Sequence, residues 1–530
     1  MRCINVPLTE TGQINKLSAD YLSGKEGLKE FYSFNPDLNV VEKAIEARKK
    51  FPVNRELLVQ RLNIQYQGYA NETNHPVLDN IQSLKNENAF TVTTGHQLNI
   101  FTGPLYFIYK IASAISYANL LQQKYPAYHF VPVYWMASED HDFDEIKYIH
   151  IWGKTLEWEE NAGGAVGKLN PASLAPIIEE LKNLLPAGAE TEGLIKLFTE
   201  AYLRRNTLAN ATRYIVNELF KEYGLVVIDG DDPALKKALV PVLEKDIFEN
   251  TFYKTINNTI TSLQKRYKLP LSPREINIFY LDADRRERIV LENGKYKVLD
   301  SDKTWTMDEL KKELRQKPEN FSPNVVLRPV YQELILPNLA YIGGNNEIAY
   351  WLELKAAFDA ANVFFPQLLV RDSALFIGKK VSEYLEMLKL KPEDLFLSLE
   401  DIKFKFYDAN DLEHESEKDT AIILEQYEKL RNDLQGLPGD LAANMVKQMN
   451  LHVKEVKKWK NDIHQKQLEL QEKKIAKIEK IYASFYPDGE LQERHDNFIP
   501  YYLQEGKGWI DMLVKEFNPL DGVCHVFVED

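Results

Sequence analysis

The chain has 530 residues and a formal net charge of −14, with 44% hydrophobic and 27% charged residues. This length exceeds what one compact core usually holds, so we expect two to four domains. The composition is that of a globular protein. The negative charge, without any long basic block, argues against binding to nucleic acid or to an anionic membrane surface.

The number of cysteines and the sequence of the N-terminus indicate the cellular compartment of the protein. Two cysteines, Cys3 and Cys524, lie near opposite ends of the chain, so neither a disulfide framework nor a cysteine zinc site is expected. The first residues lack the apolar segment of a signal peptide, and no run of 18 apolar residues occurs. We therefore expect a cytoplasmic protein without a membrane span.

The first third of the chain predicts alternating strands and helices. Residues 89–95 predict a short buried strand that ends on Gly95, and residues 129–137 predict the next strand. Between them, apolar residues recur at helical spacing from Leu105 to Leu121, and Pro104 suits the first turn of that helix. A strand, a helix and a strand in succession predict a βαβ unit with a parallel sheet.

Further strands are expected later in the chain. Residues 223–232, 324–336 and 362–377 have the pattern of strands or sheet edges. In residues 276–300, apolar and polar residues alternate on both sides of Asn293-Gly294, a dipeptide typical of a two-residue hairpin. This pattern predicts an antiparallel insertion. Together these patterns predict an α/β fold with insertions.

Beyond about residue 380 the pattern becomes helical. Residues 441–485 lack proline, and a 4-3-4-3-4 spacing connects Met445, Met449, His452, Val456, Trp459 and Ile463. After a slip typical of a stutter, the repeat resumes with Leu468, Gln471, Ile475, Ile478, Tyr482 and Phe485. This predicts one long helix. It either packs on its own domain or forms a dimerising helical hairpin with residues 422–434, in which residues 436–440 are the turn.

A polar turn, Gly95-His96-Gln97, follows the first of these strands. Ligands of open parallel sheets bind outside the carboxyl ends of the strands. A glycine-bounded turn that leads into a helix also offers backbone N–H groups and a positive dipole end to phosphate or carboxylate. The alternative is a structural turn between a strand and a helix.

A cluster of ionisable residues follows the second strand directly and comprises Glu139, Asp140, His141, Asp142, Asp144 and Glu145. Such carboxylates bind Mg²⁺, orient an amine or act as a general base. The alternatives are N-capping by Asp140 or Asp142, and a solvated acidic loop. A histidine–aspartate metal site is a further alternative, although no second histidine pair at helical spacing is present.

Two arginines occur where an unpaired charge is costly. Arg328 lies within an apolar run, so it must meet a carboxylate of the protein or of a ligand. Arg371 and Asp372 follow another apolar run and repeat the pattern of charge at a strand end. A structural ion pair is the alternative for each. The glycine-rich segment 163–169 is not a Walker A loop, because Ala162 and Leu169 stand where that motif needs Gly and Ser or Thr.

Five segments, in this order, resemble the signature segments of the bacillithiol biosynthesis cysteine-adding enzyme family (BshC): TTGHQLNIFTGPLYFIYK, VPVYWMASEDHDFDEI, GLVVIDGDDPALKK, LRPVYQELILPNLAYIGGNNEIAYW and LQERHDNF. The resemblance covers nearly all of the chain. It implies a Rossmann-like core related to nucleotidylyltransferases and class I aminoacyl-tRNA synthetases, connecting insertions, and an α-helical coiled coil that forms a homodimer. On this basis we assign residues 1–150, 206–236 and 323–380 to the core, 151–205 and 237–322 to insertions, 381–500 to the coiled-coil domain, and 501–530 to a segment that returns to the core.

The resemblance also implies an activity, the joining of L-cysteine to glucosaminyl-malate through an amide bond. A free carboxylate does not condense with an amine in water without activation. We therefore expect ATP to adenylate or phosphorylate the cysteine carboxylate, with Mg²⁺ as an optional second cofactor. Two alternatives remain open from the residues alone: a metal-dependent hydrolase that uses the acids of 139–145, and a non-catalytic dimeric scaffold.

Under the ligase hypothesis, the catalytic residues are His96, Asp140, His141 and Asp142. The substrate- or nucleotide-binding residues are Gly95, Gln97, Thr102, Gly103, Lys110, Glu139, Arg328, Gln332, Asn345, Asn346, Glu347, Arg371 and Ser373. Many family members have Gln at the position of His96 and a Gly-Pro-Gly-Glu-like turn at Gly344–Glu347. The roles of His96 and of the Asn345-Asn346 pair therefore stay open.

Overall fold

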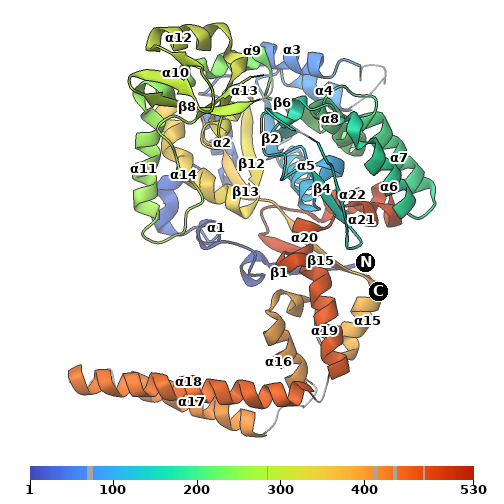
Figure 1. Ribbon diagram of the computed structural model, residues 1–530, viewed down its shortest axis with the longest axis vertical. Helices are drawn as coiled ribbons and strands as arrows, with labels where there is room; N and C mark the ends of the chain where they lie inside the picture. Colours follow the sequence, from blue (N-terminus) through green and yellow to red (C-terminus); the bar gives the residue numbers. More distant parts are fainter. Residues whose placement is uncertain are drawn as a thin grey trace.

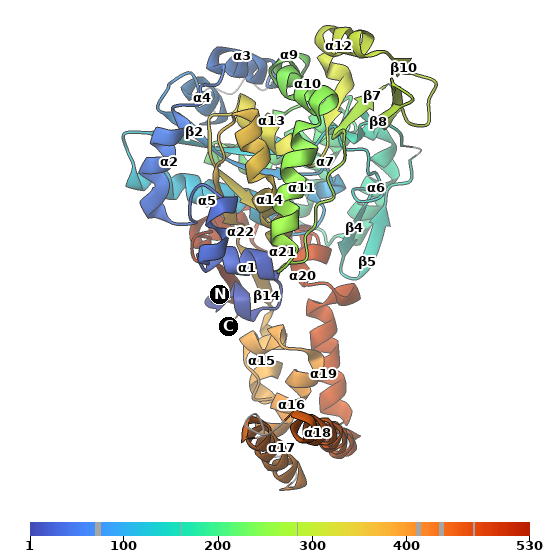
Figure 2. The same cartoon turned by 90° about the vertical axis from the view of Figure 1, so that its left-hand side faces the viewer.

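In the computed structural model, an α/β body carries a helical arm that projects from one end (Figures 1 and 2). The structure describes residues 1–68, 76–160, 162–282, 285–409, 415–433, 439–469 and 472–529. None of the helices in these ranges is long and apolar enough to cross a membrane.

The central sheet of the body has five parallel strands in the order β13-β12-β2-β3-β6. Their bounds are β2 (Ala89–His96), β3 (His129–Met136), β6 (Val226–Asp229), β12 (Asn338–Gly343) and β13 (Gln367–Val370). Helix α5 (Tyr106–Lys124) connects β2 to β3 and packs on both strands, which confirms the predicted βαβ unit. The strands are almost entirely buried, as expected of a parallel sheet covered on both faces.

Strand order places an opening at the carboxyl edge of this sheet. β2 pairs on one side with β3, which follows it in the chain, and on the other side with β12, which comes much later. Connections that leave neighbouring strands in opposite directions separate at such a point and leave a crevice. The carboxyl ends of β2, β3 and β12 therefore form the floor of a natural ligand site.

Helices surround the sheet in the body (Figures 1 and 2). The helices that precede β6 are α1 (Lys16–Leu22), α2 (Val41–Arg48), α3 (Arg55–Gln65), α4 (Pro76–Ser83), α6 (Ala175–Leu184), α7 (Ala189–Tyr202) and α8 (Leu208–Phe220). Those after β6 are α9 (Pro233–Lys236), α10 (Val240–Glu249), α11 (Thr251–Leu263), α12 (Met307–Gln316), α13 (Arg328–Ile335) and α14 (Asn345–Ala361).

The prediction of a strand over residues 324–336 is wrong. Arg328–Ile335 form helix α13, with Pro329 in its first turn, and strand β12 begins only at Asn338. A short apolar run does not by itself distinguish a buried strand from a buried helix. The expected place of Pro104 is also wrong by a small margin, because the N-cap of α5 is Leu105 and the proline precedes it.

The two insertions carry small antiparallel sheets. β4 (Tyr148–Ile151) pairs with β5 (Lys154–Glu157). The second sheet contains β7 (Ile278–Leu281), β8 (Arg286–Glu292), β9 (Lys295–Val298), β10 (Thr304–Trp305) and β11 (Phe321–Pro323). The predicted hairpin at Asn293-Gly294 is confirmed, since both residues have positive φ, at 50° and 77°, as a type I′ turn requires.

The arm is built from α15 (Lys379–Met387), α16 (Leu399–Ala409), α17 (Glu415–Asp433), α18 (Gly439–Glu469) and α19 (Glu472–Phe485). α17 packs along α18, as the hairpin interpretation predicts, and α16 packs on α19. The prediction of a single helix over 441–485 is wrong, because α18 runs at a steep angle to α19 (Figure 1). Residues 470–471, between these two helices, and most of the predicted 436–440 turn lie outside the described residues.

A three-stranded sheet joins the arm to the body. It has the order β1 (Arg2–Pro7), β15 (Val523–Val528), β14 (Ser373–Ile377), so the first and last strands of the chain pair antiparallel. Between the arm and β15 come α20 (Gln492–His495), α21 (Ile499–Glu505) and α22 (Lys507–Glu516), and α22 packs against α5 of the body. The two chain ends therefore lie close together at the base of the arm (Figure 1).

Candidate functional site

A cavity of about 840 Å³ opens at the carboxyl edge of the central sheet, which is a usual size for a small-molecule site. The ends of β2 and β3, helices α13 and α14, and the antiparallel sheet of the second insertion all contribute to its walls. The predicted site residues that line it are Gly95, His96, Gln97, Lys110, Glu139, Asp140, Arg328, Asn346 and Glu347.

His96, the last residue of β2, is held in the cavity as a neutral imidazole. Its ring packs against Tyr106 and Phe107 at centroid distances of 5.1 and 5.0 Å, and its Nδ1 lies 3.2 Å from the carbonyl oxygen of Gln97. Burial and the nearby charge of Lys110 lower the pKa of His96 to about 3. At physiological pH this side chain therefore offers hydrogen bonds to a ligand and no positive charge.

Gln97 holds the acidic segment that follows β3. Its Nε2 donates to Asp140 Oδ2 at 2.9 Å and to Glu145 Oε2 at 2.6 Å. Burial would raise the pKa of Asp140, but hydrogen bonds from His141 and Gln97 and the charge of Arg286 hold it well below its ordinary value. Asp140 is therefore an ionised carboxylate at the cavity wall, at any pH at which the protein works.

Arg286, on β8 of the second insertion, fixes this acidic segment from the opposite side. Its Nη1 donates to His141 Nδ1 at 2.9 Å and lies 3.8 Å from Asp140 Oδ1. Its Nε donates to Ser322 Oγ at 3.1 Å, and its guanidinium stacks over Phe279. The insertion thus closes over the sheet edge through one largely buried arginine.

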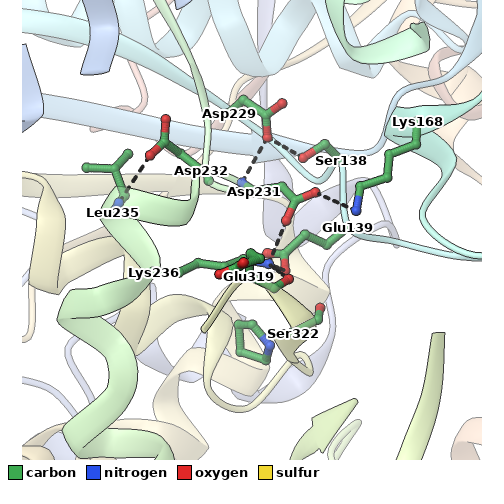
Figure 3. A network of polar contacts seen from close by, with 12 residues as sticks. Ser138, Glu139, Lys168, Asp229, Asp231, Asp232, Leu235, Lys236, Glu319 and Ser322 are labelled. Atoms are coloured by element: carbon green, nitrogen blue, oxygen red, sulfur yellow. Dashed lines mark hydrogen bonds and ion pairs between the residues drawn. The ribbon is translucent and has the colours of Figure 1, made fainter. Parts of the chain in front are cut away.

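Glu139 belongs to a buried polar network beside the cavity (Figure 3). Lys236 Nζ lies 2.6 Å from Glu139 Oε1 and 2.5 Å from Asp231 Oδ1, and it donates to the carbonyl oxygen of Glu319. Lys168, from the glycine-rich segment 163–169, reaches Asp231 at 3.5 Å. The network ties the ends of β3 and β6 to both insertions, so Glu139 has a structural ion pair as well as a place on the cavity wall.

The buried Lys110 and the half-buried Glu347 form an ion pair in the cavity wall. Lys110 Nζ also donates to the carbonyl oxygen of Gly95 at 2.8 Å. Glu347 accepts hydrogen bonds from Tyr341 Oη at 2.7 Å and from the Gly344 amide at 3.1 Å, where it caps helix α14. The pair therefore ties α5 to α14, and its charges largely compensate each other.

Arg328 differs from these residues because its charge is not compensated by a direct ion pair. Its Nη1 donates to Gln332 Oε1 at 3.0 Å, but its buried Nη2 has no hydrogen-bond partner among the described residues. No carboxylate in the described part of the chain lies within ion-pair distance of it. The guanidinium lies between Trp135 and Tyr341, at 5.9 and 5.8 Å from the ring centres. Arg328 is therefore a cation of this cavity that is open to a ligand anion.

Arg371 and Ser373 do not line the cavity. Arg371 makes two hydrogen bonds to Glu493, at 2.5 and 3.1 Å, and Ser373 Oγ donates to the same carboxylate at 2.6 Å. The structural ion pair, considered as the alternative for Arg371, is what the structure contains. The pair lies behind Tyr106, whose ring is 5.4 Å from the guanidinium.

The loop after β2 also differs from the expected anion-binding turn. The amide of Leu105 donates to the carbonyl oxygen of Asp496 at 2.8 Å, so the start of α5 faces the C-terminal segment. Thr102 and Gly103 lie in the same loop, and the Gly103 carbonyl accepts from Asn497 at 2.6 Å. Neither residue lines the cavity, because the loop turns away from the sheet edge before the helix begins.

Four more predicted residues lie outside the cavity wall. Asp142 and His141 are exposed, although His141 contacts Asp140 and Arg286. Asn345 points to the N-terminal segment, where its Nδ2 donates to the carbonyl oxygen of Gln13. Gln332 is fully buried behind Arg328 and serves to orient it.

Several cavity residues have no counterpart in the sequence prediction, namely Tyr106, Trp135, Arg274, Phe279, Arg286, Asn324, Tyr341 and Tyr350. For Tyr106 a signal existed, because it precedes Lys110 by one helical turn. For Arg274 and Arg286 there was none, since only the tertiary fold brings the second insertion over the sheet edge.

Among the described residues, no three His, Cys, Asp or Glu side chains converge as metal ligands. A Mg²⁺ ion here would depend on phosphate and water ligands with one or two carboxylates, which is common for this ion.

The fold and the site define the class of protein. It is a Rossmann-like α/β protein with an appended coiled-coil domain. Its cavity is lined by positive and negative side chains and lies where the connections of the central sheet separate. The family model "Bacillithiol biosynthesis BshC, N-terminal Rossmann-like domain" matches residues 1–372, and "Bacillithiol biosynthesis BshC, C-terminal coiled-coil domain" matches residues 374–529. The chain belongs to the BshC family.

Curated relatives agree over nearly the full length. A protein of Flavobacterium johnsoniae named "Putative cysteine ligase BshC" is 41% identical, over 96% of this chain and 97% of the relative. Proteins of the same name from Flavobacterium psychrophilum and Bacillus cereus are 40% and 27% identical, each over 96% of this chain and over 96% and 97% of the relative.

Proposed function

We propose that the chain is a cysteine ligase of bacillithiol biosynthesis. In this proposal it joins the carboxylate of L-cysteine to the amine of glucosaminyl-malate, after ATP-dependent activation of the cysteine carboxylate. Membership of the BshC family and the names of the relatives support the reaction class. The structural observation that carries the proposal is the buried Nη2 of Arg328 in the cavity, which has no hydrogen-bond partner among the described residues.

Arg328 is suited to an anionic group of a substrate. A buried guanidinium that lacks a carboxylate partner is costly, and a ligand carboxylate or phosphate removes that cost by accepting its free N–H groups. Arg274 is exposed at the cavity rim and adds a second positive charge to the path of such a ligand. The malyl carboxylates of glucosaminyl-malate and the phosphates of ATP both have this chemistry.

The part of the cavity wall that contains Asp140 and His96 is suited to an amine. Asp140 is ionised and fixed by Gln97, so it can accept a hydrogen bond from an amine and orient its lone pair toward the activated carbonyl. His96 remains neutral and can donate or accept a hydrogen bond to a polarised carbonyl oxygen. ATP supplies the leaving group that a free carboxylate lacks. Arg328 and Arg274 are the residues that would contact its phosphates.

The first test is replacement of Arg328 by methionine, with Arg315→Met as the matched control. Arg315 is an exposed arginine on α12 that pairs with Glu244. Loss of a buried, ligand-paired charge costs about 2–5 kcal/mol, or roughly 30- to 5,000-fold in kcat/KM. Bacillithiol formation from ATP, Mg²⁺, cysteine and glucosaminyl-malate is measured by mass spectrometry. Wild-type kcat/KM in Arg328→Met would contradict the assignment.

Two substitutions, compared side by side, distinguish the role of Asp140 from that of the nearby Asp142. Asp140→Asn should lower kcat by about 10²-fold, as expected when the group that orients the amine is lost, whereas Asp142→Asn should not, because Asp142 is exposed outside the cavity wall. Release of AMP in the wild-type reaction would indicate adenylation and release of ADP an acyl phosphate. No amide product with any nucleotide would refute the ligase proposal itself.

A further inference from the structure

A hydrogen-bonded cluster of Cys3, His525 and Asp372 lies in the three-stranded sheet, outside the cavity. Cys3 is exposed on the edge strand β1, and its Sγ lies 3.8 Å from His525 Nδ1 on β15. The other ring nitrogen, Nε2, lies 3.1 Å from Asp372 Oδ1. Both ring nitrogens of His525 are therefore engaged, one by a thiol and one by a carboxylate.

The burial of Asp372 determines the charge of this cluster. The carboxylate is 2% exposed, and its Oδ2 has no hydrogen-bond partner among the described residues. Its Oδ1 accepts from the Asn518 amide at 2.9 Å, and His525 is its ion-pair partner in the described part of the chain. A buried carboxylate of this kind needs a counter-ion, and the imidazolium of His525 is the group placed to provide it.

The surroundings of His525 favour its protonated form. Burial alone would lower the pKa of His525, but the hydrogen bonds to Asp372 and Cys3 raise it to about 9. Asp521, in the turn before β15, adds a further negative charge nearby. The rings of Phe517 and Phe527 also pack near the imidazole, at centroid distances of 5.1 and 6.1 Å, and carry no charge. At neutral pH the Nδ1–H of a cationic ring thus points at the Cys3 sulfur.

We propose that Cys3 is a thiol–disulfide exchange site for low-molecular-weight disulfides, activated by its contact with the imidazolium of His525. A cation that donates a hydrogen bond to sulfur stabilises the thiolate, which is the nucleophile in this exchange. The site is independent of the proposed ligase reaction, because none of the three residues lines the cavity.

The exchange step balances without an added oxidant. The Cys3 thiolate attacks one sulfur of a disulfide RSSR, the S–S bond of the reagent breaks, and a Cys3–S–S–R bond forms. The released thiolate RS⁻ takes a proton from water. His525 keeps its proton throughout and returns to pairing with Asp372 alone. The exposed position of Cys3 on an edge strand gives the reagent access to the sulfur.

The test uses the purified full-length protein and the uncharged probe bis(2-hydroxyethyl) disulfide at pH 7. Mass spectrometry follows the mixed disulfide on the N-terminal peptide. We expect wild-type Cys3 to react at least tenfold faster than Cys3 in His525→Gln. Asn5→Ala is the control, because Asn5 is the other hydrogen-bond partner of the sulfur and is uncharged; it should react like the wild type. Equal rates in the wild type and His525→Gln would overturn the proposal.

The buried Cys524 reports on folding in the same experiment. It should stay unmodified in every folded variant, and its labelling would show that a variant has unfolded. If His525→Gln unfolds, the wild type at pH 6 is compared with N-acetylcysteine amide, whose thiol is largely protonated there. Faster exchange at Cys3 would support activation by His525, and exchange no faster than that of the free thiol would overturn it.

Discussion

At the scale of single residues, most charged side chains of the cavity are paired with an opposite charge of the protein, whereas one arginine requires a ligand for this. Lys110 pairs with Glu347, and Arg286 faces Asp140. Arg328 donates to the neutral side chain of Gln332 and forms no direct ion pair among the described residues. This difference points to Arg328 as a contact for substrate, although the sequence presents all of these arginines and lysines in much the same way.

Replacement of His96 by glutamine should make the melting temperature less sensitive to acid. The pKa of His96 is about 3 in the folded protein against 6.5 ordinarily, so between these values the unfolded chain binds a proton that the folded chain does not. Stability then falls as the pH falls below 6.5, by roughly 1.4 kcal/mol per pH unit. Glutamine does not bind a proton in this pH range, so the variant lacks this loss of stability.

Calorimetry between pH 7.5 and 5 measures this effect as the difference in melting temperature between the variant and the wild type. As the pH falls, the melting temperature of His96→Gln should rise relative to that of the wild type. His452→Gln, at an exposed position on α18, is the control and should show a constant difference. A constant difference for His96→Gln as well would mean that His96 takes up its proton in the folded state.

The residues of the site were partly predictable from sequence for a physical reason. Parallel strands bring their carboxyl ends to one edge, so Gly95, His96 and Asp140 could be placed together from the strand pattern alone. Arg371 could not be placed, because its partner Glu493 is far away in the sequence. Nor could Arg286, whose approach to the cavity depends on how an insertion docks.

At the scale of secondary-structure elements, the α17–α18 hairpin buries only part of its apolar surface. Met449 and Val456 are buried between the helices. Large apolar side chains that remain exposed are Ile422, Ile423, Leu430, Met445, Leu451 and Trp459. Exposed apolar residues concentrated on one hairpin are typical of an interaction surface. We propose that this surface mediates a homodimer of the chain.

Trp459→Glu should shift the protein toward monomer in sedimentation velocity without loss of helicity. Trp459 is 53% exposed, so its replacement removes contact area between copies and leaves the hairpin packed. Val456→Asp is the contrasting variant. It is 5% exposed between α17 and α18, and its replacement should reduce helicity by circular dichroism. An unchanged mass for Trp459→Glu, at concentrations where the wild type associates, would rule out this surface.

Some secondary-structure elements could be predicted from the local sequence pattern, and others could not. The Asn293-Gly294 hairpin was predictable because a type I′ turn needs two residues that tolerate positive φ. The helix α13 was not, since its eight residues have the apolar content of either a strand or a helix. The change of direction between α18 and α19 also escaped prediction, because a heptad stutter does not distinguish continuation from a bend.

On the scale of the whole molecule, the sheet β1-β15-β14 is the joint between body and arm. Val526 lies in its middle strand and is fully buried. Val526→Asp should lower the free energy of unfolding by about 3 kcal/mol or more, because it places a carboxylate in an apolar layer. The matched control is Ile64→Asp, at an apolar position on α3 that is 45% exposed.

Thermal unfolding with limited proteolysis measures this prediction. Val526→Asp should melt at a lower temperature than Ile64→Asp and should be cleaved first near the junction at β14. Equal melting temperatures for the two variants would show that the joint adds little to the stability of the body.

The pairing of β1 with β15 also has a consequence for biosynthesis. Strand β1 is synthesised before all the other described elements, while its partner, residues 523–528, is synthesised after them. At common rates of translation the interval is on the order of half a minute or more. Throughout that time β1 is a strand without its partner, so the base of the arm can close only after the arm and the described part of the body have been synthesised.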